Sequence, residues 1–120
     1  MKPENLLLDS NFTLKVADFG FAAPTQGRTG TGFLHTFLGT LQFMAPEILQ
    51  NQPYQGQQAD LFALGVVLFL METGRSPYTR ARQEDKHYAL ICSNRPDLFF
   101  NSHGYHEFSP EFKDLFTNMV

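Results

Sequence analysis

The fold of this chain is decided by the stretch KPENLLLDSNFTLKVADFG, residues 2–20. It contains two β-prone runs, Leu6 to Leu8 and Phe12 to Val16. Between them lie Asp9, Ser10 and Asn11, which favour turns because their side chains bond to nearby backbone groups. The pattern predicts a β-hairpin.

The predicted hairpin fixes which residues meet at its open end. Asn5 precedes the first strand and Asp18 follows the second, so an amide oxygen and a carboxylate would lie side by side. Oxygen donors of this kind suit a hard cation such as Mg²⁺. Lys2 lies at the same end, and the three groups together suit the charge of a triphosphate and its metal. We therefore predict a magnesium and nucleotide site there.

Three motifs in one order resemble the signature of a large enzyme family. Lys-Pro-Glu-Asn at 2–5, Asp-Phe-Gly at 18–20 and Ala-Pro-Glu at 45–47 are similar to the signature set of eukaryotic protein kinases. The form of the first motif resembles serine/threonine kinases, and the chain is most similar to their calcium/calmodulin-dependent group. The resemblance implies ATP and Mg²⁺ as cofactors, with Asn5 and Asp18 on the metal. It implies proteins with serine or threonine as substrates and an upstream activating kinase as a further partner.

The resemblance also implies that part of the kinase domain lies outside this sequence. In the motif H-R-D-x-x-x-x-N the catalytic aspartate stands five residues before the asparagine. Counting back from Asn5 passes Met1, so that aspartate and the amino-terminal lobe are not included. We expect residues 1–120 to be a mainly α-helical carboxy-terminal kinase lobe with one small β-hairpin, truncated at both ends and inactive alone. The alternative is a non-catalytic pseudokinase or a protein-docking module.

Composition is consistent with one small intracellular domain. The 120 residues are 42% hydrophobic and include 13 phenylalanines, so a core is available. A formal net charge of -3 predicts no nucleic-acid partner. The single cysteine, Cys92, excludes an internal disulfide, and its apolar surroundings predict a buried thiol. Without a signal peptide or membrane segment, the chain is predicted to be intracellular and cytoplasmic.

Residues 21–44 are rich in glycine, threonine and glutamine, which predicts a mobile loop. By the resemblance, residues 18–47 form the activation segment, with Thr36 as the candidate phosphosite. Thr40 would bond to Lys2 and to the catalytic aspartate; the alternative is an ordinary loop hydroxyl. An apolar pocket for the residue after the phosphoacceptor would be lined by Leu38, Leu41 and Met44.

The resemblance assigns roles to further residues of the motifs. Lys2 would stabilise the transferred phosphoryl group, and Glu4 would lie on the nucleotide side as the only acid left to attract a basic substrate residue. One family stack of side chains would contain Phe19, and another would contain Leu7, Val67 and Met71 and be completed by adenine. Gly20 would have a structural role. Glu47 would lack its usual arginine partner, at a cost of about 3–5 kcal/mol for a buried carboxylate.

An unbroken run of apolar residues and glycine extends from Leu61 to Met71. It is too short to span a bilayer, so it predicts a buried central helix at about 59–73, with Asp60 capping its first turn. In the family the matching aspartate also holds the H-R-D backbone. Further helices are predicted at 46–50, at 83–92 and from Ser109 to about 119. His103 and His106 could pair on a metal, but without a third ligand at suitable spacing we predict no metal there.

Overall fold

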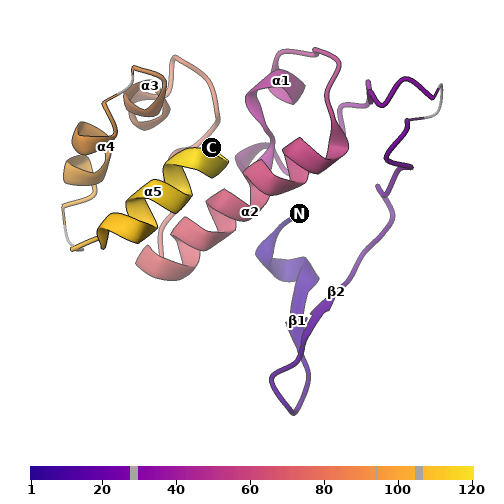
Figure 1. Cartoon of the computed structure of the whole chain (residues 1–120), viewed down its shortest axis with the longest axis horizontal. Helices are drawn as coiled ribbons and strands as arrows, with labels where there is room; N and C mark the ends of the chain where they lie inside the picture. Colours follow the sequence, from indigo (N-terminus) through magenta and orange to yellow (C-terminus); the bar gives the residue numbers. More distant parts are fainter. Residues whose placement is uncertain (28–29, 94, 105–106) are drawn as a thin grey trace.

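The computed structural model describes residues 1–27, 30–93, 95–104 and 107–120. A two-stranded sheet and a set of helices make up the described fold. In chain order the elements are η1 (Pro3–Asn5), β1 (Leu6–Leu8), β2 (Leu14–Val16), η2 (Leu41–Phe43), α1 (Pro46–Leu49), α2 (Gly56–Thr73), α3 (Lys86–Cys92), α4 (Pro96–Ser102) and α5 (Pro110–Met119). Figure 1 shows the hairpin extending away from a helical body that is crossed by α2. The predicted fold class is confirmed.

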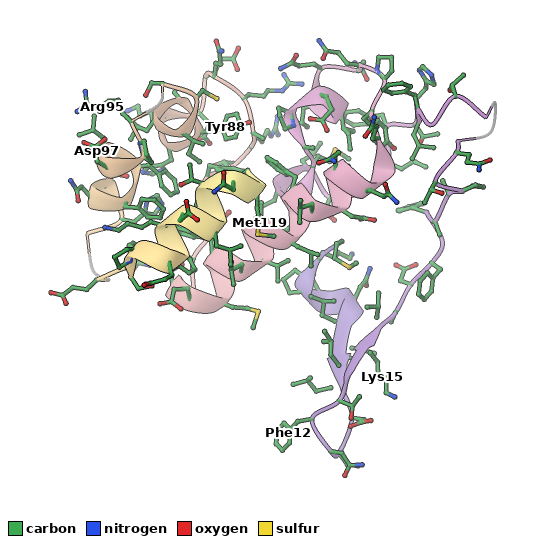
Figure 2. All side chains as sticks on the ribbon, in the orientation of Figure 1. Phe12, Lys15, Tyr88, Arg95, Asp97 and Met119 are labelled. Carbon is green, nitrogen blue, oxygen red and sulfur yellow. The ribbon has the colours of Figure 1, made fainter. Side chains whose placement is uncertain are left out.

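The hairpin forms where the sequence predicts it, but its second strand is shorter than expected. β1 and β2 pair antiparallel, with Leu6 opposite Val16. Phe12 has a φ of 60°, and the Asp9 carboxylate accepts hydrogen bonds from the N–H groups of Asn11 and Thr13, both at 2.9 Å. These bonds extend the turn to residue 13 and lower the pKa of Asp9. Figure 2 shows Phe12 at the hairpin tip, away from the helices.

The apolar run forms α2 as predicted, but the helix begins at Gly56 rather than near residue 59. Asp60 therefore lies inside the helix, and the prediction that it caps the first turn is wrong. Its carboxylate instead lies 3.5 Å from the amino group of Met1. Among the described residues, no helix combines the length and apolar character that crossing a bilayer requires.

Helix α2 packs closely against α5 at Gly65. A Cβ atom at that position would lie 2.8 Å from Val120 Cγ1 and 2.9 Å from Met119 Cβ. A larger residue would push the two helices apart, so the glycine is what permits their close approach. The helix ends at Gly74, whose φ of 69° is typical of a left-handed C-terminal cap.

Two clusters form the core, one at the amino-terminal half of α2 and one at its carboxy-terminal half. The first joins α1, η2 and the amino-terminal half of α2, and its buried members are Phe43, Met44, Ala45, Ile48, Leu49, Phe62, Ala63, Val66, Val67, Tyr78, Ala81 and Tyr88. The second is aromatic and consists of Phe69, Phe99, Phe100, Phe108 and Phe116. Phe69 lies at its centre, with ring centroids 5.5 Å from Phe99 and 5.0 Å from Phe116.

Helices α3 and α5 start at residues whose side chains cap them. Asp85 caps α3 by accepting hydrogen bonds from the N–H groups of His87 and Tyr88, which is why this helix starts at Lys86 rather than at residue 83. Ser109 caps α5, because its hydroxyl accepts a hydrogen bond from Phe112 N at 3.1 Å. That predicted helix start is confirmed.

Two features near α3 differ from the sequence prediction. Cys92, predicted to be buried, is exposed, because it lies on the last turn of α3 where the apolar neighbours in sequence face elsewhere. Helix α4, which starts at Pro96, was not among the helices predicted from the sequence. Proline suits the first turn of a helix, since its missing N–H would have no partner there.

Candidate functional site

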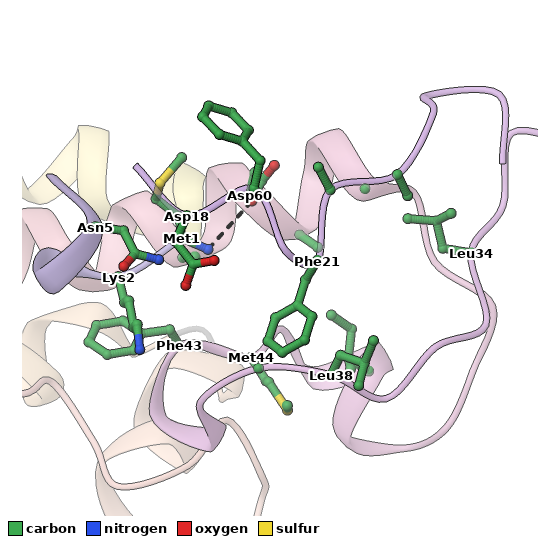
Figure 3. Close-up of a pocket in the computed structure, with 18 of the residues that line it drawn as sticks. Met1, Lys2, Asn5, Asp18, Phe21, Leu34, Leu38, Phe43, Met44 and Asp60 are labelled. Carbon is green, nitrogen blue, oxygen red and sulfur yellow. Dashed lines mark ion pairs between the residues drawn. The ribbon is translucent and has the colours of Figure 1, made fainter. Parts of the chain in front are cut away.

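A cavity of about 530 Å³ opens beside the hairpin, the segment that follows it and the first turns of α2. Its size is in the range of ligand pockets, which is about 300–1,000 Å³. The four polar residues that the sequence assigned to metal binding or phosphoryl transfer line this cavity, namely Lys2, Asn5, Asp18 and Thr40, and so does Asp60. Figure 3 shows the Asn5 and Asp18 side chains pointing into the same space, with Lys2 beside them.

The hairpin register brings Asn5 and Asp18 together. Ala17 N donates a hydrogen bond to Asn5 O at 2.8 Å, which adds one rung beyond the last strand pair, Leu6 with Val16. Asp18 is the next residue and Asn5 is held in η1, so both side chains leave the hairpin at its open end. The predicted pairing of an amide and a carboxylate at one mouth is what the structure contains.

A tight turn orients the Asp18 carboxylate. Asp18 has a φ of 61°, in the left-handed region that few residues other than glycine adopt, although aspartate adopts it more often than most. Its Oδ1 accepts a hydrogen bond from Gly20 N at 3.2 Å. The ion pairs between described residues involve other acids, namely Asp60, Asp9 and Asp97. The Asp18 side chain is exposed and is therefore available to a cation.

The donor set at this mouth fits a magnesium ion that is shared with a nucleotide. No group of three or more histidine, cysteine or acidic residues that could hold a metal occurs among the described residues. Mg²⁺ does not need such a group, because it is usually bound by one or two carboxylates together with water and substrate phosphates. The second histidine of the pair considered above, His106, lies outside the described residues, and His103 Nδ1 lies 2.9 Å from Phe99 O.

Lys2 and Thr40 line the same cavity although they are far apart in the sequence. Thr40 precedes η2, and its carbonyl accepts a hydrogen bond from Phe43 N at 3.0 Å. In the part of the chain that the structure describes, no hydrogen bond joins the Thr40 hydroxyl to Lys2. The bond between these two residues therefore stays a prediction.

The three residues of the predicted substrate pocket are brought together only in part. Leu38 and Met44 line the cavity, Leu38 as an exposed side chain and Met44 as a buried one. Leu41 lies in η2 and is not among the lining residues. The apolar wall next to the polar mouth is completed instead by Phe43 and Phe21.

The two predicted stacks do not form as packed units among the described residues. Val67 is buried in the core, but Leu7 and Met71 are 51% and 77% exposed. Phe19 is 70% exposed, although it borders the cavity. Glu4 is exposed and does not line the cavity. Their roles stay predictions from the family resemblance.

Glu47 differs from the expectation of a buried, unpaired carboxylate. It lies in α1 and is only half-buried, and the described residues include no buried charged side chain. A half-buried carboxylate keeps part of its hydration, so the penalty of a fully buried charge does not apply. The expected cost of about 3–5 kcal/mol is therefore too large.

The predicted loop at 21–44 is held by a residue that sequence reasoning missed. Leu34 and Tyr54 form an isolated antiparallel bridge. The Tyr54 hydroxyl also donates to Thr36 O at 3.0 Å and lies 3.1 Å from the Thr36 hydroxyl. Tyr54 stands in a polar stretch with Pro53 and Gly56, and nothing in that stretch signals a partner so far away in sequence.

Comparisons with known proteins agree with the motifs. The protein kinase domain model matches residues 1–120. CBL-interacting protein kinase 11 of Oryza sativa subsp. japonica is 43% identical over 120 residues, which cover all of this chain and 22% of that protein. CBL-interacting serine/threonine-protein kinase 26 of Arabidopsis thaliana is 49% identical over 78 residues, which cover 65% of this chain and 18% of that protein. The chain spans about a fifth of the length of these relatives.

Proposed function

Because the chain belongs to the protein kinase family, of the serine/threonine type, we propose that the protein containing it transfers phosphoryl groups from ATP to serine and threonine hydroxyls of other proteins. The observation that carries this proposal is the shared cavity of Asn5 and Asp18. A protein that does not use a metal-bound nucleotide has no evident need for both oxygen donors at one mouth. The cytoplasm, where ATP and Mg²⁺ are abundant, is the compartment that goes with this proposal.

Each polar residue of the cavity has a distinct part in the proposed reaction. The Asn5 amide oxygen and the Asp18 carboxylate would hold Mg²⁺, which when bound neutralises charge on the phosphates of ATP. Lys2 would place its ammonium group near the phosphoryl group in transit, where a fixed positive charge lowers the energy of the transition state. Thr40 would restrict the position of Lys2. Catalysis in such a site comes mainly from positioning and electrostatics.

The general base of the family motif precedes Asn5 and is not among these 120 residues. Loss of a general base typically costs about 10²–10⁴ in rate. We therefore propose that the 120-residue chain by itself binds magnesium and ATP weakly and transfers no phosphate at a useful rate. Activity is a property of the full-length protein, with an upstream kinase acting on Thr36.

The names of the relatives record an interaction with CBL proteins. Those proteins are about five times longer than the segment that matches this chain. We therefore propose that the full-length protein binds a CBL protein, and the basis for this proposal is the names of these relatives.

One observation favours the alternative of a non-catalytic docking module. The hairpin exposes the apolar side chains of Leu8, Leu14 and Val16, which the strand register places on one face of the two-stranded sheet. Contiguous exposed apolar surface is typical of an interaction site. The two functions differ in one measurable respect, because a docking module would remain intact when magnesium and ATP binding is removed.

The proposed function is tested by replacing the metal-binding carboxylate in the full-length protein. Wild type, with Mg²⁺ and ATP at saturation, is expected to phosphorylate a serine- or threonine-containing peptide, at a turnover of about 1–100 s⁻¹ for a typical kinase. Asp18→Asn should lose that activity because it removes the charge that holds the metal. The control is Asp97→Asn, which alters an exposed acid paired with Arg95 on α4 and should keep wild-type turnover. Wild-type turnover in Asp18→Asn would overturn the assignment.

A further inference from the structure

The Tyr54 side chain holds the segment that carries Thr36. Leu34 N donates to Tyr54 O at 2.8 Å, and Tyr54 N donates to Leu34 O at 3.0 Å. This reciprocal pair aligns the two segments antiparallel for one rung. Beyond that rung the Tyr54 hydroxyl reaches Thr36, with its oxygen 3.0 Å from Thr36 O and 3.1 Å from Thr36 Oγ1.

The number of available protons determines which of these groups donates. Tyr54 has one hydroxyl hydrogen, and that hydrogen is donated to the carbonyl oxygen of Thr36. The contact between the two hydroxyls can then be a hydrogen bond only if Thr36 is the donor. The Tyr54 oxygen therefore accepts the hydrogen that Thr36 would have to give up on phosphorylation.

We propose that Tyr54 is a latch that restrains the Thr36 hydroxyl and slows its phosphorylation. The latch consists of the bridge between Leu34 and Tyr54 and the two contacts of the Tyr54 hydroxyl with Thr36. The inference rests on the proposed function, in which Thr36 is the phosphosite. Tyr54 acts through Thr36 and is a positioning residue rather than a catalytic one.

The chemistry of transfer requires the latch to change. Thr36 Oγ1 would attack the γ-phosphorus of ATP held by the phosphorylating kinase, so that a new O–P bond forms and the bond to the bridging oxygen of ADP breaks. ADP leaves with the electron pair, and the hydroxyl proton passes to the base of that kinase. The ester oxygen left on Thr36 carries no hydrogen, so it cannot donate to Tyr54. At least one contact of the latch is therefore lost in the phosphorylated state.

The position of Tyr54 connects this change to the helical body. Gln55, the next residue, is the N-cap of α2, and the helix begins at Gly56. Leu34 packs tightly here, since a Cβ atom at Gly56 would lie 3.1 Å from Leu34 Cδ1. Release of the Tyr54 hydroxyl would therefore loosen the segment from the start of the same helix whose first turns line the cavity.

The test compares two substrate proteins with one enzyme. Unlabelled wild-type full-length protein, with Mg²⁺ and ATP, serves as the upstream kinase that acts on a second copy of the protein. The substrates are full-length ¹⁵N-labelled Asp18→Asn proteins, which cannot phosphorylate themselves, with and without Tyr54→Phe. Mass spectrometry of the labelled peptide gives the rate at Thr36. Tyr54→Phe keeps the ring and removes the hydroxyl, so the rate should rise about three- to tenfold, the effect of one or two hydrogen bonds.

A matched substitution controls for the loss of a tyrosine hydroxyl as such. Tyr88→Phe alters a buried tyrosine on α3 that does not contact Thr36, and it should leave the rate at Thr36 unchanged. Equal rates with and without Tyr54→Phe would overturn the latch. So would an equal rise in Tyr88→Phe, because the effect would then come from general loosening of the fold.

A second readout does not depend on phosphate transfer. Hydrogen exchange of the amides of Leu34 and Tyr54, which form the bridge, should be faster in Tyr54→Phe than in the parent protein. If the enzyme phosphorylates a peptide but never Thr36, the kinase function stands, a different kinase acts on Thr36, and hydrogen exchange decides the latch. If it phosphorylates nothing, the kinase function fails and exchange alone decides. Unchanged exchange at both amides would then overturn the restraint.

Discussion

The two parts of this molecule on either side of Phe43 differ in what they bury. Every buried hydrophobic side chain of the described core lies at Phe43 or later. Before it, Gly27 is the only described residue that is buried. The polar residues of the candidate site come from the earlier part, with Lys2, Asn5 and Asp18 at the hairpin mouth.

The difference teaches that the site and the stability of this fold depend on different residues. Apolar burial is the main favourable term in folding, and here the helices supply it. The hairpin is held by its short ladder and by the Asp9 turn, and its strands contribute to the core only through the partly buried Leu6 of β1. Substitutions in the two parts should therefore change different measurements.

The largest expected effect comes from the aromatic cluster. Phe69 is fully buried between α4 and α5, so Phe69→Ala in the full-length protein should lower the free energy of unfolding by about 3–5 kcal/mol. Phe12→Ala removes the same ring from the hairpin tip, where it is 83% exposed, and should change the free energy by at most about 0.5 kcal/mol. Urea unfolding of both variants measures the contrast. Similar losses in the two would show that the hairpin also belongs to the core.

A smaller effect of opposite sign is expected at Tyr78. Its hydroxyl is the one buried side-chain polar atom without a hydrogen-bond partner among the described residues. Burial also raises its pKa. Tyr78→Phe removes an unsatisfied group and keeps the ring, so it should stabilise the fold by about 1–2 kcal/mol without altering turnover. A lower melting temperature for Tyr78→Phe would mean that the hydroxyl has a partner in solution.

The smallest expected effect lies at the cap of α3 and depends on pH. Partial burial acts to raise the pKa of Asp85. That effect is outweighed by hydrogen bonds from the backbone N–H groups of Thr79, Tyr88, Arg80 and His87, so the pKa of Asp85 is lowered. A carboxyl with a lowered pKa in the folded state contributes stability above its unfolded pKa, near 3.9, and that contribution is lost as the pH falls through the folded pKa.

Asp85→Ala should therefore cost about 1 kcal/mol at neutral pH and less in acid. Unfolding measured from about pH 2 to pH 6 in both proteins gives the difference at each pH. The difference should shrink as the pH falls. A constant difference across that range would show that the charge of Asp85 is not what supports α3.

The parts of the fold that the sequence predicted are those with local causes. The turn at Asp9 and the Ser109-Pro110 start of α5 act within a few residues, and an unbroken apolar run is sufficient to predict a buried α2. The predicted cap of α2 was wrong because the helix begins at Gly56, with Gln55 as its N-cap, several residues before the apolar run from which the helix was predicted.

In the candidate site, too, the residues that could be predicted are those whose positions have a local cause. Asn5 and Asp18 could be paired from sequence because a short hairpin fixes the positions of its two ends. The contact of Tyr54 with Thr36 joins two irregular segments. Neither the hydrophobic periodicity nor a turn motif in the sequence predicts such a contact. The exposure of Cys92 was missed for a different reason, since apolar neighbours in sequence do not determine which side of a short helix faces the core.

The central claim is that the hairpin brings Asn5 and Asp18 to one metal ion, and a double-mutant cycle tests it most directly. Calorimetric titration with Mg²⁺ and ATP would compare full-length wild type, Asn5→Leu, Asp18→Asn and the double variant. If both residues bind one ion, each single substitution should weaken binding, and the double variant should bind no more weakly than the weaker single variant. Losses that simply add, or wild-type affinity in either single variant, would contradict the account.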